Sequence, residues 1–125
     1  MKAALLEKIN APLVIRELLP TMLMPGQVLV KVKASGLCGA QLHEIRGHRG
    51  NEKFLPHPMG HEGCGIVKEV GPGVTTVKEG DKVVMHWRPG SGIESDFPKY
   101  VINGTDKLIT GGKCTTLSEE SIVSE

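Results

Sequence analysis

The chain has 125 residues, 39% of them hydrophobic, which allows one domain with a modest core and leaves no room for two. Its 15 lysines and arginines nearly balance 14 acidic residues, so no broad basic surface is available for phosphates and we expect no nucleic-acid partner. No apolar run approaches the roughly 20 residues of a membrane helix, and the odd count of three cysteines, after a start without a leader-like run, favours a soluble, cytoplasmic chain with reduced thiols.

The first half of the chain predicts strands and one short helix. Apolar-rich runs at residues 1–7 and 13–19 flank a turn signal and predict a hairpin. Residues 27–33 carry valine at every second position, which is the period of a half-buried strand. Residues 40–46 predict a short helical turn, and residues 47–58 predict a loop rich in glycine, proline and charge.

The second half of the chain predicts further short strands. Residues 63–70 and 81–87 are bounded by glycine-containing turns, residues 88–98 are irregular, and short apolar pieces at 100–102 and 121–123 complete a sheet. Many short strands with almost no helix predict an all-β barrel or sandwich.

Motifs that bind nucleotide phosphates are missing from the sequence. Neither Gly-x-Gly-x-x-Gly nor Gly-x4-Gly-Lys-Ser/Thr occurs, so we assign no cofactor-binding residue to this chain and expect any nucleotide to be held elsewhere. Residues 118–125 resemble a strand that stops without a closing turn, and we therefore expect the chain to be a fragment.

One thiol and one imidazole are candidates for a metal site. Cys38 and His61 each stand beside glycine, which lets the backbone turn sharply near an ion, and Glu62 follows His61 directly. A soft thiolate with an imidazole suits zinc. Spacing alone supports a buried thiol and a surface histidine equally well. Cys64 and Cys114 fit buried small hydrophobes better than metal ligands.

Four segments carry a family resemblance when they are considered together. They are residues 36–43 (GLCGAQLH), 55–67 (LPHPMGHEGCGIV), 70–74 (VGPGV) and 80–83 (GDKV). Their order and spacing resemble the GroES-like catalytic domain of the zinc-dependent medium-chain alcohol dehydrogenases over residues 1–125. The fold that this resemblance implies is an all-β, GroES-like barrel with short helical turns.

The resemblance also implies a metal site and a reaction. Cys38 and His61 match the first two catalytic zinc ligands, whereas the third ligand would follow Glu125. Glu62 matches the acidic residue beside the zinc, which can act catalytically or exchange into coordination, with a solvated carboxylate as the alternative. Zn²⁺ would act as a Lewis acid on the substrate oxygen, and hydride would pass to NAD(P) bound by a following Rossmann domain that is absent from this chain.

Two departures from the family pattern concern proton transfer. His43 matches the residue that passes the alcohol proton to solvent, although an ordinary exposed histidine is the alternative. Ala40 stands where the family commonly has a hydroxyl. Gln41 stands where Asp is common, and its amide oxygen is expected to accept the N–H of His61. Trp87 matches a residue that lines the substrate pocket, with core packing as its alternative role.

We therefore predict the catalytic-domain part of a zinc-dependent oxidoreductase that transfers hydride between an alcohol and NAD(P), with this chain inactive alone. Its partner is a small-molecule alcohol or carbonyl, and the full-length protein is expected to be a homo-oligomer. Residues 88–100 contain no cysteine, so they offer no structural zinc site of the kind found in many relatives. A stand-alone, non-enzymatic GroES-like binding module and a zinc-free, quinone-reductase-like protein are the alternatives.

Overall fold

Short antiparallel strands form two sheets in the computed structural model, which describes residues 1–50 and 52–125. In chain order the elements are β1 (Lys2–Leu6), β2 (Val14–Pro20), β3 (Gln27–Ser35), α1 (Gly39–Ile45), the 3-10 turn η1 (Glu52–Phe54), β4 (His57–Pro58), β5 (Gly63–Val70), β6 (Lys82–Met85), β7 (Lys99–Ile102), β8 (Leu108–Thr110) and β9 (Glu120–Ser124). The predicted all-β class with a short helical turn is confirmed. No helix among the described residues is long and apolar enough to cross a membrane.

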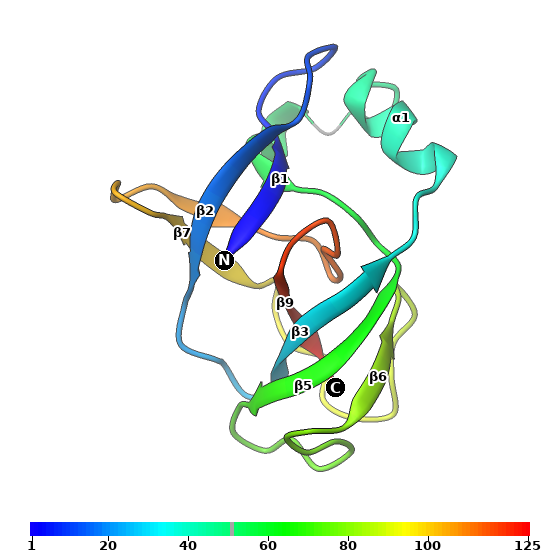
Figure 1. Ribbon diagram of the computed structural model, residues 1–125, viewed down its shortest axis with the longest axis vertical. Coiled ribbons are helices and arrows are strands. Elements are labelled where there is room, and N and C mark those ends of the chain that lie inside the picture. The colour runs from blue at the N-terminus through cyan, green and yellow to red at the C-terminus, as the bar shows by residue number, and fades with distance from the viewer. Residues whose placement is uncertain (51) are drawn as a thin grey trace.

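The two sheets curve around a shared interior. The first has the strand order β4-β1-β2-β7-β8 and the second has the order β6-β5-β3-β9. Figure 1 shows the second sheet with β5, β3 and β6 side by side, and shows α1 at the periphery, after the end of β3. This arrangement is a barrel-like fold in which α1 lies outside the sheets.

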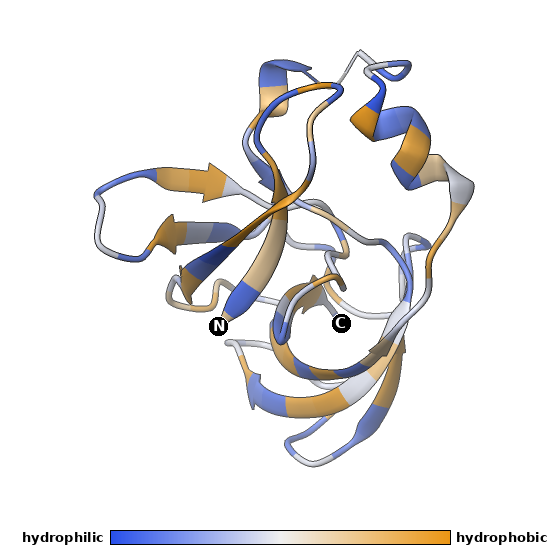
Figure 2. Ribbon diagram, turned by 45° about the horizontal axis from the view of Figure 1, so that its top comes forward, coloured by the Kyte–Doolittle hydropathy of each residue, from blue (hydrophilic) through white to orange (hydrophobic). Residues whose placement is uncertain are grey.

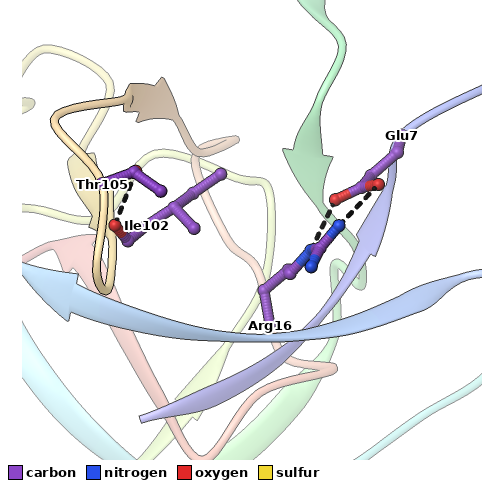
Figure 3. A network of polar contacts seen from close by, with 4 residues as sticks. All are labelled: Glu7, Arg16, Ile102 and Thr105. Atoms are coloured by element: carbon purple, nitrogen blue, oxygen red, sulfur yellow. Dashed lines mark hydrogen bonds and ion pairs between the residues drawn. The ribbon is translucent and has the colours of Figure 1, made fainter.

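The predicted N-terminal hairpin is confirmed. β1 pairs with β2 so that Leu5 lies opposite Val14. At the turn end of the hairpin, the guanidinium of Arg16 donates to both carboxylate oxygens of Glu7 over 2.8 and 3.2 Å (Figure 3). Because this pair holds two charged groups in one bidentate geometry, it lowers the pKa of Glu7.

A buried tyrosine joins the two sheets. Tyr100 of β7 is fully buried in a cluster that also contains Leu5 and Leu18 of the first sheet and Leu29 and Ile122 of the second. The backbone N–H of Ile122 donates to the Tyr100 hydroxyl over 2.9 Å. Burial raises the pKa of Tyr100, so the phenol stays protonated and acts as a neutral polar link in an otherwise apolar core.

Strand β3 has buried residues on both of its faces. Val28 and Val30 pack in a second cluster with Val67 and Met85, whereas Leu29 points into the first cluster. The two-residue alternation of β3 was predicted, but the expectation of a half-buried strand is wrong for this part of β3, because Leu29, on the face opposite the valines, is buried in the other core. Along the strands, apolar and polar residues alternate visibly in Figure 2.

Two short strands lie where no strand was predicted. β4 falls within the expected loop at 47–58, and β8 covers Leu108–Thr110. Both are sheet edges, of two and three residues, and each is too short to show a hydrophobic period. The predicted irregular segment at 88–98 contains no strand.

The link between the sheets can be tested with Tyr100→Phe. The substitution keeps the ring and leaves the buried N–H of Ile122 without its partner, so we expect a loss of about 1–3 kcal/mol in the free energy of unfolding. Urea unfolding measures this loss. Thr105→Val is the control, because it removes only exposed hydrogen bonds, one to the Ile102 carbonyl (Figure 3) and one from the Lys107 N–H, and should change stability by less than about 0.5 kcal/mol. Unchanged stability of Tyr100→Phe would contradict the role given to this hydroxyl.

Candidate functional site

The pairing of β3 with β5 brings the two candidate ligands to the same end of the second sheet. Ser35, the last residue of β3, lies opposite Gly63, the first residue of β5. Cys38 therefore leaves the sheet three residues after this pair, and His61 enters it two residues before. The N–H of Gly36 donates to the Glu62 carbonyl over 3.0 Å and extends the contact beyond the sheet. Two residues far apart in the sequence thus meet because the strands that carry them are neighbours.

Gln41 links Cys38 to His61. Its Oε1 atom accepts the backbone N–H of Cys38 over 2.7 Å, and its Nε2 atom lies 3.2 Å from Nδ1 of His61. The amide is buried, with 6% of the residue exposed, whereas the Cys38 side chain is exposed and His61 is half-buried. The backbone of Cys38 and the imidazole of His61 are therefore held on either side of one buried amide.

The direction of these hydrogen bonds differs from the sequence prediction. The amide oxygen of Gln41 was expected to accept the N–H of His61, but that oxygen is already occupied by the N–H of Cys38. The amide nitrogen can only donate, so Nδ1 of His61 accepts, and the neutral ring carries its proton on Nε2. To bind a metal through Nε2, the ring has to move that proton to Nδ1, where Gln41 offers no acceptor.

Two hydroxyl groups hold the backbone beside His61. Thr116, 1% exposed, donates its hydroxyl to the Glu62 carbonyl over 2.8 Å, and its Oγ1 lies 2.8 Å from Oγ of Ser35. The Glu62 side chain lies against Gly36. A Cβ atom added to Gly36 would be only 2.5 Å from Glu62 Oε1, so this position has no room for a side chain unless Glu62 moves. Sequence analysis did not identify Thr116, which comes from a segment 54 positions after Glu62.

A glycine is required directly before His61. Gly60 has a φ angle of +98°, and an added Cβ atom would lie 2.6 Å from the backbone nitrogen of Leu117. The predicted reason for a glycine beside this ligand is therefore supported at Gly60. At Gly39, beside Cys38, an added Cβ atom would meet no atom within 4 Å, so that glycine has no such steric role.

The remaining histidines of this region lie in two pairs. His43, on α1, is exposed, and its Nδ1 atom lies 3.3 Å from Nδ1 of His48. His57 lies with its Nε2 atom 3.8 Å from a carboxylate oxygen of Glu44, also on α1. His43 and Glu44 are consecutive on the helix, so α1 contributes to both pairs.

A mostly apolar cavity of about 220 Å³ borders the site. The residue before His61, Gly60, lines it, together with Glu44, Phe54, His57, Pro58, Met59, Trp87, Phe97, Thr110, Gly111, Gly112, Cys114 and Thr115. Trp87 is 49% exposed, which agrees better with a wall of a cavity than with the alternative of core packing. We call this the aromatic cavity because Phe54, Trp87 and Phe97 belong to its lining.

The other two cysteines differ in their surroundings. Cys114 is fully buried, as expected, and burial raises the pKa of its thiol to about 11, so it stays protonated near neutral pH. Cys64 was expected to be a buried small hydrophobe, but this is wrong, because it lies on an outward-facing position of β5 and is exposed.

The donor set of the site fits a zinc ion in part. The thiol of Cys38 and the imidazole of His61, whose backbone and ring contact a common amide, are the atom types that zinc prefers. Across residues 1–50 and 52–125, no three Cys, His, Asp or Glu side chains gather closely enough to hold a metal ion. Cys38 and His61 could thus offer at most two ligands from this region, and the Gln41 amide opposes the ring tautomer that a metal requires.

Comparison with known proteins identifies relatives in one family. A family model described as the alcohol dehydrogenase GroES-like domain matches residues 24–123. An alcohol dehydrogenase of Geobacillus stearothermophilus is 44% identical over 87 residues, which cover 70% of this chain and 26% of that protein. The NDMA-dependent alcohol dehydrogenase of Amycolatopsis methanolica is 43% identical over 93 residues, which cover 73% of this chain and 24% of that protein. The chain thus spans about a quarter of the length of the curated relatives that it matches.

Solved structures agree on the fold. The alcohol dehydrogenase of Aeropyrum pernix superposes with a TM-score of 0.69 at 27% identity, over 99% of this chain and 38% of that one. An alcohol dehydrogenase zinc-binding domain protein of Burkholderia ambifaria gives a TM-score of 0.84 at 22% identity, over 99% of this chain and 40% of that chain. The second likeness, at its lower identity, concerns the fold alone.

Replacing the amide of Gln41 by a carboxylate tests the hydrogen-bond analysis. In Gln41→Glu, one side chain of the same length can accept both the Cys38 N–H and a proton on Nδ1 of His61, which leaves Nε2 free for a metal. We expect zinc to bind about 10–100-fold more tightly, the range associated with a hydrogen-bond partner of a ligand. Isothermal titration calorimetry measures the affinity.

Two controls accompany this measurement. Asn103→Asp adds the same charge in an exposed turn and should leave zinc affinity unchanged. Gln41→Met removes the amide donor without supplying an acceptor and should tighten binding less than Gln41→Glu does. Equal affinities of the parent chain and Gln41→Glu would show that the polarity of this amide does not limit metal binding.

Proposed function

Because the chain belongs to the alcohol dehydrogenase GroES-like domain family, we propose that it is the catalytic-domain part of an oxidoreductase that interconverts an alcohol and a carbonyl compound. The observation that carries this proposal is the pairing of β3 with β5, which brings the segments of Cys38 and His61 to one end of the second sheet, at the edge of the aromatic cavity. A thiol, an imidazole and an adjacent apolar space are the parts that a metal-assisted reaction of a small organic molecule needs.

In this proposal, Cys38 and His61 hold zinc, and a third ligand comes from beyond Glu125. Bound zinc would supply a Lewis acid for the substrate oxygen, and NAD(P), held outside this chain, would exchange hydride with the carbon. Glu62 keeps a carboxylate beside the ligands, where it is available for exchange into coordination. The Thr116 hydroxyl fixes the backbone that carries His61 and Glu62.

The aromatic cavity is the proposed substrate site. Its volume of about 220 Å³ and its mostly apolar lining suit the carbon skeleton of a small alcohol or carbonyl compound. Trp87 provides a flat apolar wall that orients the substrate. Because Gly60 has no side chain, its own backbone borders the cavity directly. The Glu44–His57 pair is the charged element in this wall and would favour a substrate with one polar substituent.

Proton transfer in the proposed reaction has to do without a hydroxyl at residue 40. Ala40 has no group that could pass a proton from the substrate oxygen, so a water molecule takes that place. His43 is exposed on α1, and an imidazole is suited to exchange a proton with solvent near neutral pH. We therefore assign His43 as the final proton carrier.

The direction of the Gln41 hydrogen bonds favours a second candidate function. An amide that donates to His61 stabilises the metal-free ring, which suits a non-enzymatic GroES-like binding module. Zinc affinity separates the two candidates, because such a module has no use for the Cys38 thiol.

Removal of one thiol tests the proposed metal site. Cys38→Ser should weaken zinc binding by more than about 100-fold, beyond the loss expected for a hydrogen-bond partner alone. Cys64→Ser, which alters another exposed thiol, should leave the affinity unchanged. Cobalt substitution gives a second readout, since a thiolate-to-metal absorption band should be present in Cys64→Ser and absent in Cys38→Ser. Tight zinc binding that survives Cys38→Ser would refute the assignment.

The proposed proton carrier is tested in the complete enzyme, with this chain joined to its nucleotide-binding part. His43→Gln should lower turnover about 10–100-fold below neutral pH, within the contribution of general acid–base groups, and imidazole buffer should restore part of it. His86→Gln is the matched control and should keep parental turnover, because His86 accepts a hydrogen bond from the Arg88 N–H and lies outside the proposed machinery. The same pH profile for His43→Gln and the parent would contradict the assignment.

A further inference from the structure

Two imidazole rings meet at the carboxyl end of α1. The Nδ1 atoms of His43 and His48 are 3.3 Å apart, the ring centroids are 5.5 Å apart, and the ring planes are tilted by 47°. Both side chains are exposed. The two nitrogens therefore face each other at a position open to solvent.

The backbone that ends α1 fixes this pair. Gly47 adopts a φ angle of +73°, its N–H donates to the Glu44 carbonyl over 3.0 Å, and the N–H of His48 donates to the His43 carbonyl over 2.9 Å. These two bonds form a Schellman motif, which brings together the side chains at the positions of His43 and His48. Apolar side chains usually occupy these positions, whereas here both are imidazoles. The close approach of the rings is thus a consequence of how the helix terminates.

The distance between the nitrogens matches the span of two ligands on a tetrahedral ion. With zinc–nitrogen bonds of about 2.0–2.1 Å and a tetrahedral angle, two nitrogen ligands are separated by about 3.3–3.4 Å. An ordinary hydrogen bond from N–H is shorter, with a typical separation of about 2.9–3.0 Å. The 3.3 Å separation is long for the hydrogen bond that the two rings make with each other in the absence of a metal, and it equals the spacing of two ligands on one cation.

Nearby charges set the expected strength of such a site. The backbone carbonyls at the end of α1 favour a cation, as do unpaired helix carbonyls in general. Arg46 and Arg49, in the same segment, repel one. The only carboxylate within the helix, Glu44, lies toward His57. We therefore expect weaker binding than at a site with four protein ligands.

From these observations, we propose that His43 and His48 form a second zinc site, which uses neither Cys38 nor His61. Each ring binds through Nδ1 as a neutral imidazole that carries its proton on Nε2, and water completes the coordination. The site goes beyond the proposed reaction. Occupation would also withdraw Nδ1 of His43 from proton transfer, a consequence that rests on the proposed function.

Zinc titration of the chain with the first site removed tests the proposal. In the Cys38→Ser/His61→Asn background, calorimetry with zinc chloride should detect one binding event that His48→Gln weakens at least tenfold. His86→Gln, which removes a different exposed imidazole, should leave it unchanged. No zinc binding in the background protein, or equal loss in the two variants, would overturn the site.

A second variant keeps both imidazoles and changes only the turn. In Gly47→Ala, the positive φ angle is strained, and the new Cβ atom would lie 2.9 Å from Glu52 Oε1 and from Ile9 Cγ2. We expect weaker zinc binding by this variant. Nitrogen-15 NMR of the histidine rings in the background protein should show zinc-dependent shifts of Nδ1 in His43 and His48 together. A shift of only one ring, or parental affinity of Gly47→Ala, would show that the motif does not build the site.

Discussion

The antiparallel pairing of β3 with β5 is the constraint on which the rest of the site depends. It runs from Val28 opposite Val70 to Ser35 opposite Gly63, with two register shifts along its length. Because both strands end at the same edge of the sheet, the segments that carry Cys38 and His61 leave that edge together. The Gln41 amide then sets the relation between the thiol and the ring.

One short helix, α1, contributes side chains to each part of the candidate site. α1 begins directly after Cys38 and ends before Gly47 reverses the backbone. Its buried side places Gln41 against His61, while its exposed side presents His43. Glu44, the next residue of the helix, lines the aromatic cavity. A helix of seven residues therefore touches the candidate metal site, the cavity and the histidine pair.

Local patterns in the sequence were sufficient for most of the framework. The valine alternation identified β3, and glycine-bounded apolar runs identified β5 and β6, because these signals depend only on neighbouring residues. Burial on the second face of β3 was not predictable in this way, since Leu29 is buried by Tyr100 and Ile122, from distant parts of the chain. β4 and β8 were missed because edge strands of two or three residues carry no period.

The candidate site shows a similar division. Residue types and flanking glycines made Cys38 and His61 candidates, but only the resemblance of four segments to a known family singled them out as metal ligands. The orientation of the Gln41 amide could not be predicted, because it depends on a backbone N–H that becomes available only once α1 has formed. Thr116 was also out of reach, since its contact with Glu62 requires the last part of the chain to fold against β5. The His43–His48 contact depends on the φ angle of Gly47.

X-ray absorption at the zinc edge, recorded on the chain with less than one equivalent of zinc, tests most directly whether Cys38 and His61 bind zinc together, as we propose. We expect one sulfur at about 2.3 Å and nitrogen at about 2.0–2.1 Å in the coordination shell. A shell that contains only nitrogen and oxygen would contradict this proposal.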